Sequence, residues 1–417
     1  MNPFVGYRCS ICKREYSPGE VTYTCPEDGG NLDVLLDYAR IKSHINPGHI
    51  LSGQETSLWK YLQLLPLEDP GFLHTPIRAA GGTPVFFCTV LAQQLGLRAL
   101  WIKDESWNPT ASFKDRASAI VVARAQAIRK EVVITASTGN AGAALAGMAA
   151  AVAQKSVILA PKTAPPAKIA QLLVYGADVV LVDGNYDQAF DLSIEAAKEF
   201  NWYCRNTGYN PFTAEGKKTA AFEIWDWFEH QQFSGRLDDR LVILVSVGDG
   251  NIISGIHKGF KDLYKLGWID RFPRIIGVQA EGSAAVARTF ARGSEVIEPV
   301  IANTLADSIS VDMPRDGIRA IRAAVETGGT YVTVSDQQIL VAIRQLGKVG
   351  IFAEPAGATA YAGLVKAVER GVVSPDDLVM VINTGSGLKD VKAAMQSVSS
   401  APVIEPSLAA LKKVMRI

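Results

Sequence analysis

The chain has 417 residues, of which 48% are apolar and 20% are charged, and its 42 lysines and arginines balance its 42 aspartates and glutamates. This length and composition fit a globular, well-packed protein of two or three domains, and the zero net charge gives no electrostatic argument for binding nucleic acid or an anionic membrane. The sequence contains no apolar run that could span a membrane and no apolar core of a signal peptide at its start, and five cysteines fit a reducing compartment better than a disulfide framework, so we expect a soluble, cytoplasmic protein.

Residues 1–35 have the outline of a zinc ribbon, in which two cysteine knuckles clamp one metal ion tetrahedrally. The first knuckle is Cys9-x-x-Cys12. The second should read Cys-Pro-x-Cys, but Cys25 is followed by Pro, Glu and Asp28. Three thiolates and the Asp28 carboxylate could still hold zinc. The alternative is a remnant that has lost its metal and keeps its cysteines as core, and either form would have a structural role.

Residues 36–80 have the character of an arm, in which Leu58, Leu62 and Leu65 recur at helical spacing. From residue 81 onward, β-branched runs alternate with alanine-rich amphipathic stretches. Buried strands are predicted at residues 97–105, 131–137, 155–161, 177–184, 240–248, 274–281 and 377–385. Helices are predicted at residues 115–130, 140–154, 186–200 and 335–347, with a last one in the tail. The alternation predicts an α/β fold of parallel sheets covered by helices on both faces.

Glycine-rich loops follow three of the predicted strands, at the carboxyl ends where ligands bind in such sheets. Gly248, Asp249, Gly250, Asn251 and Ile252 follow a buried strand and open a helix, so converging backbone N–H groups and the helix N-terminus suit a phosphate group. The alternative is a tight turn without a ligand.

The other two loops and one lysine offer polar groups. Ser137 and Thr138 could bind an anion at a helix start, Asn140 could offer an amide, and Thr384 could reach into a crevice. Read alone, these loops are more typical of N-caps and turns. Lys114, in "NPTASFKDRASA", is either part of a solvated helix start or a lysine held for covalent chemistry. Together, one lysine and a phosphate loop indicate a Schiff base with pyridoxal phosphate, which carries an aldehyde and a phosphate.

The chain resembles the fold-type II pyridoxal phosphate enzymes, and within them the threonine synthases, over residues 55–395. The resemblance is carried, in family order, by "SLWKYLQLLPL", "GGTPVF", "IKDESWNPTASFKDRASA", "STGNAGAALAGMAA", "NPFTAEGKKT", "VGDGNIISG", "FAEPAGATAYAGL" and "NTGSGLKD". It implies two doubly wound parallel-sheet domains. The large domain would comprise residues 36–110 and 211–400 and the small domain residues 111–210, with the zinc-ribbon-like extension at residues 1–35 and a tail at residues 401–417.

The resemblance also implies roles for individual residues. Lys114 would form the internal aldimine and shuttle protons. Asn140 would bind the 3′-oxygen of the cofactor, Gly248 through Ile252 its phosphate, and Thr384 would face its pyridine nitrogen. Ser137 and Thr138 would take the substrate carboxylate, and Glu354 and Pro355 would form a wall.

Two positions depart from the threonine synthase pattern. The arginine that usually lies three residues after the Asn-Pro dipeptide begins is Thr213 here. The segment 307–317 reads "DSISVDMPRDG" instead of containing an Ile-Gly-Asn-Pro run. Lys217, Lys218, Arg205, Arg315 or Lys162 could replace the missing cation.

The function implied by the resemblance is conversion of O-phosphohomoserine and water to threonine and phosphate by a homodimer acting on a small amino-acid substrate. Two other readings stay open. One is a serine or threonine dehydratase, or a β-replacement synthase using phosphoserine or acetylserine, on the same scaffold. The other is a regulatory binding protein with a vestigial site.

Overall fold

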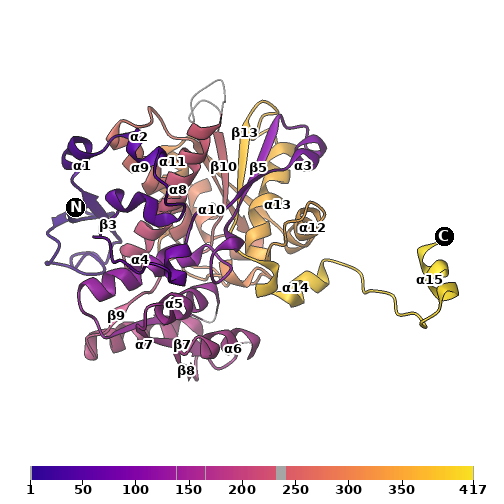
Figure 1. Cartoon of the computed structure of the whole chain (residues 1–417), viewed down its shortest axis with the longest axis horizontal. Helices are drawn as coiled ribbons and strands as arrows, with labels where there is room; N and C mark the ends of the chain where they lie inside the picture. Colours follow the sequence, from indigo (N-terminus) through magenta and orange to yellow (C-terminus); the bar gives the residue numbers. More distant parts are fainter. Residues whose placement is uncertain (1, 138, 165, 232–240, 417) are drawn as a thin grey trace.

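A computed structural model describes residues 2–137, 139–164, 166–231 and 241–416 of the chain. Its largest element is a six-stranded sheet with the order β12-β11-β10-β13-β5-β4, in which only β4 runs antiparallel to its neighbour. The strands are β12 (Thr330–Val334), β11 (Arg274–Ala280), β10 (Leu241–Ser246), β13 (Leu378–Asn383), β5 (Ala99–Asp104) and β4 (Val85–Phe87). Helices surround this sheet (Figure 1).

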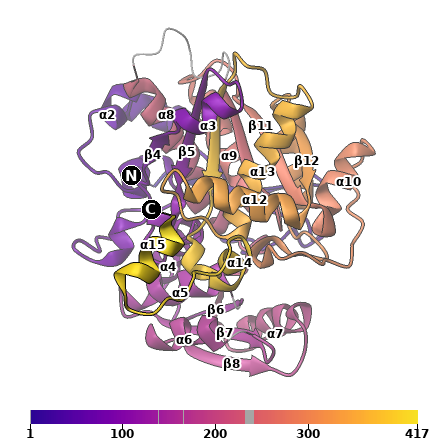
Figure 2. The same ribbon diagram turned by 90° about the vertical axis from the view of Figure 1, so that its right-hand side faces the viewer.

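A second sheet of four parallel strands lies below the first in Figures 1 and 2 and has the order β8-β7-β6-β9. Its strands are β8 (Asp178–Val182), β7 (Lys155–Pro161), β6 (Val132–Ala136) and β9 (Tyr203–Cys204). A third, antiparallel sheet at the N-terminus has the order β2-β1-β3, from β1 (Phe4–Cys9), β2 (Glu15–Tyr16) and β3 (Leu32–Leu36). The α/β class predicted from the sequence is confirmed, whereas the exact domain boundaries stay a prediction.

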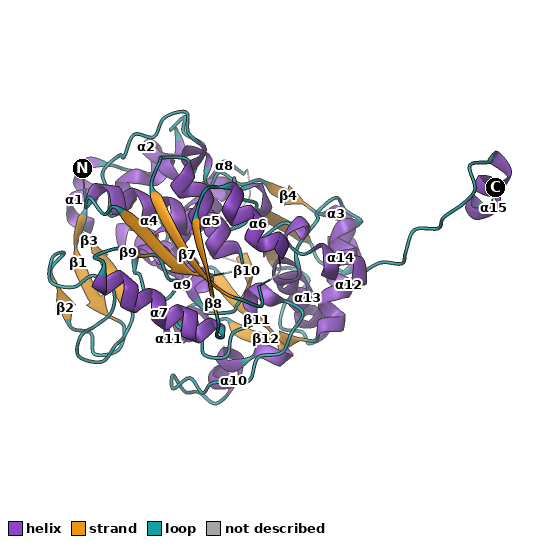
Figure 3. Ribbon diagram, turned by 90° about the horizontal axis from the view of Figure 1, so that it is seen from below, coloured by secondary structure: helices purple, strands orange, loops and turns teal. Residues whose placement is uncertain are grey.

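After the N-terminal sheet, helices alternate with the strands (Figure 3). The α-helices of the first half are α1 (Tyr38–His44), α2 (Pro47–Leu51), α3 (Thr89–Gln94), α4 (Lys114–Ala127), α5 (Asn140–Ala150), α6 (Pro166–Val174), α7 (Tyr186–Glu199) and α8 (Phe212–His230). Those of the second half are α9 (Asn251–Leu266), α10 (Ala285–Ala291), α11 (Gly317–Glu326), α12 (Asp336–Gly347), α13 (Pro355–Glu369), α14 (Val391–Gln396) and α15 (Leu408–Met415). Short 3₁₀ helices are η1 (Leu58–Leu64), η2 (Pro76–Ala79), η3 (Glu105–Trp107), η4 (Glu281–Ser283), η5 (Asp307–Ile309) and η6 (Gly387–Lys389). None of the described helices has the length and apolar character needed to cross a membrane.

Both faces of the six-stranded sheet are buried, as the central strand β10 illustrates. Ile243 and Val245 pack in a core with residues of α8 and α9, whereas Val242 and Leu244 pack in a core with residues of α12 and α13. Because both faces of the strand meet helices, the strand reads as a continuous apolar run.

All seven predicted strands are present, but one prediction about burial is wrong. The strand predicted at residues 177–184 was expected to be buried, yet β8 is largely half-buried or exposed. The reason is its position at the edge of the four-stranded sheet, where only one neighbour covers it. Sequence periodicity also missed β4, β9 and β12, which are short or only half-buried.

The interpretation of residues 36–80 as an arm is wrong. Leu58, Trp59 and Tyr61 are almost fully buried against the body of the same chain, and the Tyr61 hydroxyl donates to Asp226 of α8 at 2.8 Å. The helical spacing of the leucines produces the 3₁₀ helix η1. The segment that does stand apart is the tail, in which α15 lies away from the body at the end of an extended stretch (Figures 1 and 3).

Candidate active site

Two loops that lie far apart in the sequence are hydrogen-bonded to each other beside Lys114. The Phe113 N–H donates to the carbonyl oxygen of Thr384 at 2.9 Å, and the Ser386 N–H donates to that of Ala111 at 3.1 Å. Ala111 adopts a left-handed backbone with φ of 62°, which turns the chain into α4. The pairing places Lys114, the first residue of α4, next to Thr384 at the end of β13.

The Lys114 amine lies in an environment that favours its neutral form. Burial lowers its pKa, and the nearby Arg205 guanidinium lowers it further, while Glu354 and Asp249 oppose this shift. Within the described residues, the amine makes no hydrogen bond or ion pair. An amine that is neutral and free of partners is able to act as a nucleophile or a base.

The glycine loop after β10 approaches other backbone so closely that larger residues would clash. A Cβ on Gly250, where φ is 93°, would lie 2.6 Å from the Asp316 carbonyl oxygen, and one on Gly248 would lie 2.9 Å from Ile309 Cα. The loop ends at the N-terminus of α9, whose first N–H groups have no intrahelical acceptor. The buried Ser246 hydroxyl at its start has no hydrogen-bond partner among the described residues. These groups suit an anion.

Polar side chains form hydrogen bonds that hold the glycine loop in place. The Asn251 amide donates to Asp316 at 2.7 Å, while its oxygen accepts from the Lys217 amine at 2.6 Å and from the Thr213 hydroxyl at 3.1 Å. The Arg315 N–H donates to the Asp249 carboxylate at 3.2 Å. Thr213, which stands where threonine synthases usually have arginine, therefore supports the loop.

Asn140 and Glu354 form a wall of the same site. The Asn140 amide donates to Glu354 Oε1 at 2.7 Å and lies 3.4 Å from the Ser308 hydroxyl. A Cβ on Gly385 would lie 2.4 Å from that Glu354 oxygen, so the glycine makes room for the carboxylate. Burial raises the pKa of Glu354, although Lys114 and Lys389 lower it.

Arg205 is a buried cation that lines the same cleft. Its Nε donates to Ser118 at 3.1 Å and its Nη1 to Thr207 at 2.6 Å, but its Nη2 has no hydrogen-bond partner among the described residues. Nor does it form an ion pair within the described chain. Burial lowers its pKa to about 10, and the guanidinium stays charged at neutral pH.

These groups line two adjoining cavities that share Lys114, Thr207, Asp249 and Ser308. The smaller cavity is lined by Lys114, Ser246, Thr384 and the glycine loop. The larger, of about 400 Å³, is lined by Lys114, Ser137, Asn140 and Arg205. Its size suits a small-molecule ligand.

The structure therefore brings most of the predicted site residues into one cleft. The residues that line it are Lys114, Ser137, Asn140, Gly248, Asp249, Gly250, Asn251, Ile252 and Thr384. Thr138 lies outside the described residues. The individual roles predicted for these residues stay predictions.

Sequence reasoning missed the hydroxyls of Thr207, Ser246 and Ser308, which line the smaller cavity. The sequence contained one signal for Thr207. Thr207 belongs to an Asn-Thr-Gly sequence that directly follows the β9 region, and the same three residues follow β13 around Thr384. Ser308 belongs to the departing segment 307–317 and lines both cavities.

The five residues named as substitutes for the missing arginine fall into two groups, those that line the cleft and those that pair with carboxylates. Arg205 and Lys217 line the cleft. The other three have carboxylate partners: Lys218 pairs with Asp262 at 2.8 Å, Arg315 with Asp187 at 2.8 Å and Lys162 with Asp183 at 2.5 Å.

Pyridoxal phosphate fits this set of groups. Its aldehyde matches the Lys114 amine and its phosphate matches the glycine loop with the Ser246 hydroxyl, two groups that have no hydrogen-bond partner in the part of the chain that the structure describes. Its ring nitrogen matches the Thr384 hydroxyl, since a buried hydroxyl can donate or accept.

Comparisons with known proteins point the same way. Residues 77–385 match the family model described as "Pyridoxal-phosphate dependent enzyme". The chain is 38% identical to a threonine synthase of Methanocaldococcus jannaschii, covering 98% of this chain and 99% of that protein. It is 37% identical to one of Methanosarcina acetivorans, covering 97% of each. Among solved structures, threonine deaminase isoform 2 from Solanum lycopersicum matches 85% of this chain and 99% of its own, with a TM-score of 0.64 and 22% identity, which supports the fold alone.

Proposed function

Since the chain belongs to the pyridoxal-phosphate dependent enzyme family, and within it to the threonine synthases, we propose that it converts O-phosphohomoserine and water to threonine and phosphate. In this reaction the bond between the γ-carbon and the phosphate oxygen breaks, and water adds a hydroxyl to the β-carbon. The cleft offers a base, Lys114, and a buried guanidinium, Arg205, for these steps.

Pyridoxal phosphate, when bound, supplies an electron sink for the charge that develops on the substrate carbons. Lys114 would hold its aldehyde end, Gly248 through Ile252 its phosphate, Asn140 its 3′-oxygen, and Thr384 its ring nitrogen. A hydroxyl at Thr384 does not enforce a protonated ring as a carboxylate would, which favours elimination and replacement at the β- and γ-carbons. Ser137 and Thr138 would take the substrate carboxylate.

The Lys114 amine would carry the protons. Because burial and the Arg205 charge lower its pKa, the amine is able to accept the α-proton of the substrate and to return a proton later at a neighbouring carbon. Lys114 and Arg205 line the same cavity, so the proton acceptor and the cation for the leaving group border one space.

The observation that carries the proposed substrate is the incomplete hydrogen bonding of Arg205. A buried guanidinium without a carboxylate is costly unless an anion completes its shell. Arg205 lines the same cavity as Lys114, and its buried Nη2 has no hydrogen-bond partner among the described residues. A phosphate ester on the amino acid, held by this guanidinium, would satisfy it and leave as phosphate.

The reaction is tested by incubating the purified chain with O-phosphohomoserine and measuring phosphate release and threonine formation. We expect the two products in equal amounts. Pyruvate or 2-oxobutyrate formed instead from free serine or threonine would favour the dehydratase alternative. Replacement products from phosphoserine or acetylserine would favour the β-replacement alternative.

The Arg205→Met variant is expected to lower kcat/KM for O-phosphohomoserine by about 30- to 1,000-fold, because a buried, charge-assisted contact to the leaving group is lost. The matched control is Lys162→Met, which removes a solvent-exposed cation already paired with Asp183 and should leave kcat/KM unchanged. An unchanged kcat/KM in the Arg205 variant would contradict the assignment.

We also propose that the enzyme is a cytoplasmic homodimer. Support comes from α15, an amphipathic helix held off the body, on which Leu408, Leu411 and Met415 are exposed. A second copy of the chain could cover this apolar face. Sedimentation equilibrium should give twice the chain mass, and the double variant Leu408→Ser, Leu411→Ser should shift the equilibrium towards monomer. A monomeric parent protein would overturn the proposal.

A further inference from the structure

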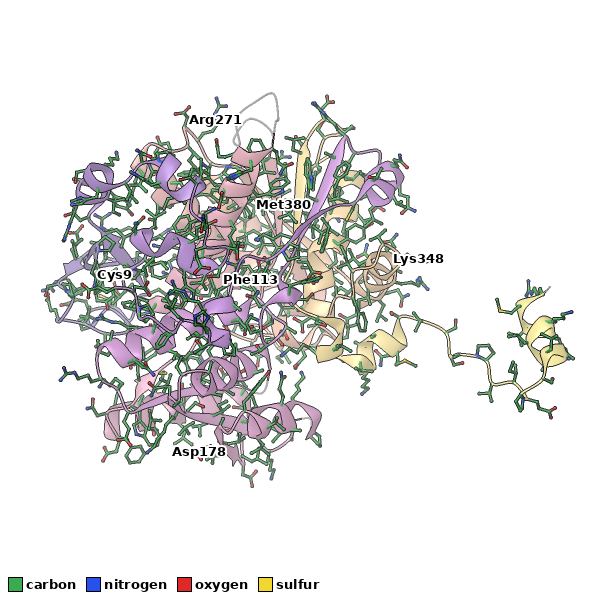
Figure 4. All side chains as sticks on the ribbon, in the orientation of Figure 1. Cys9, Phe113, Asp178, Arg271, Lys348 and Met380 are labelled. Carbon is green, nitrogen blue, oxygen red and sulfur yellow. The ribbon has the colours of Figure 1, made fainter. Side chains whose placement is uncertain are left out.

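A second cluster of reactive side chains lies in the N-terminal sheet, away from the catalytic cleft. Figure 4 labels Cys9 on the side of the molecule where the N-terminal sheet lies, and Phe113, the neighbour of Lys114, near the middle. Cys9 ends β1, Cys12 follows in the turn, and Cys25 and Asp28 come from the loop before β3. The sulfur atoms and one carboxylate oxygen of these four residues all lie within 4.8 Å of one another.

Two of the separations within this cluster match the edges of a tetrahedron around a metal ion. The Cys12 and Cys25 sulfurs are 3.7 Å apart, and the Cys9 sulfur lies 3.3 and 3.5 Å from the two Asp28 oxygens. Zinc–sulfur bonds of about 2.3 Å and zinc–oxygen bonds of about 2.0 Å in tetrahedral geometry give edges of about 3.7 and about 3.5 Å. A disulfide would need sulfurs about 2.0 Å apart, so the thiols are not bonded to each other.

The backbone around the cluster is arranged to support negatively charged ligands. The Ile11 N–H donates to the Cys9 sulfur at 3.3 Å, while the Asp28 carboxylate accepts from the Cys12 N–H at 3.2 Å and from the Gly30 N–H at 2.8 Å. A Cβ on Gly30 would lie 2.8 Å from the Cys9 sulfur, so only glycine leaves space for the ligands. Hydrogen bonds from the backbone to the ligand atoms, such as these, orient the side chains that bind a metal ion.

We propose that Cys9, Cys12, Cys25 and Asp28 bind one structural zinc ion. Thiolates favour zinc over magnesium or calcium, and a carboxylate is an accepted fourth ligand. All four coordination positions are supplied by the chain, so no position is open for a substrate or water. The ion would hold together a small sheet of three short strands that has little core of its own.

The zinc-bound sheet would also brace the catalytic cleft. The Asn31 amide, at the start of β3, donates to the carbonyl oxygens of Gly208 and, at 3.0 Å, Arg315. Arg315 in turn donates its N–H to the Asp249 carboxylate, and the Asp316 N–H donates to the Asp249 carbonyl oxygen at 2.9 Å. The ion would therefore help to keep the glycine loop in place.

Metal analysis of the purified full-length chain tests the site. We expect about one zinc ion per chain, and loss of zinc in Cys12→Ser and in Asp28→Asn. The matched control is Cys88→Ser, because Cys88 is buried elsewhere, at the start of α3, and its loss should leave the zinc content unchanged. A parent protein that carries no zinc and takes up none, or a Cys12→Ser variant with full zinc content, would overturn the proposal.

Two further measurements keep the test independent of misfolding. Cobalt substitution of the parent protein should give the visible bands of tetrahedral thiolate-bound cobalt, and Asp28→Cys should strengthen its thiolate-to-cobalt charge-transfer bands. Absorption typical of octahedral cobalt would contradict the assignment. Removing zinc with a mercurial reagent and a chelator should also increase the loss of pyridoxal phosphate on gel filtration. Unchanged retention would overturn the bracing role.

Discussion

The Lys114→Ala variant is expected to lose about 10³-fold or more of the turnover of O-phosphohomoserine, since both the covalent anchor and the proton carrier are removed. The amine it removes is partner-free among the described residues and shares its cavity with the glycine loop and Thr384. Steady-state phosphate release measures the loss. Added ammonia or methylamine should restore part of the rate, because a free amine can enter the space left by the side chain.

The Lys155→Ala variant is a suitable control, because it removes an exposed lysine paired with Glu131 at the surface. It should retain full turnover. Borohydride reduction of the parent protein, followed by peptide mass spectrometry, should place the cofactor on Lys114. Attachment at Lys217, the other lysine lining the cavity, would show that the lysines were assigned wrongly.

The Arg116→Met variant is expected to lower the free energy of unfolding by about 3–5 kcal/mol, because it leaves buried carboxylates without their main partner. Arg116 is fully buried. Its guanidinium donates to Glu105 at 2.7 Å and to both oxygens of Glu223 at 2.6 and 2.7 Å. Lys103 also donates to Glu223, at 2.7 Å. The ion pair of Arg116 with Glu223 joins α4, which begins at Lys114, to α8.

Urea titration followed by circular dichroism measures this effect. The control Arg8→Met breaks an exposed pair with Glu15 and should cost less than about 1 kcal/mol.

Although burial raises the pKa of Glu223, Arg116 and Lys103 lower it to about 2. Stability gained from a lowered carboxylate pKa is present above the unfolded pKa and is lost as the pH falls through the folded pKa. The difference in free energy of unfolding between the parent protein and Arg116→Met should therefore shrink as the pH falls from about 4.5 to about 2. A difference that grows over this range would contradict this account.

The Arg116 result also shows where sequence reasoning stopped. The charge cluster that follows Lys114 could equally belong to a solvated helix face. Only the fold brings Glu223, which is more than 100 positions away, against Arg116, and a pairing over that distance leaves no pattern in the local sequence. The same applies to Arg205, which the sequence offered as one of five cations without a means of choosing among them.

Local properties of the sequence were sufficient for seven of the strands and for the glycine loops, and the loops taken together indicated the candidate lysine. Apolar runs identify strands that are covered on both faces, and glycines identify turns that side chains would block, because both effects act over a few neighbouring residues. The tertiary structure alone decided which loops meet. The pairing of Phe113 with Thr384, the contact of Asn140 with Glu354, and the cluster of three sulfurs with Asp28 depend on where strands end in space, and that is set by sheet order and packing.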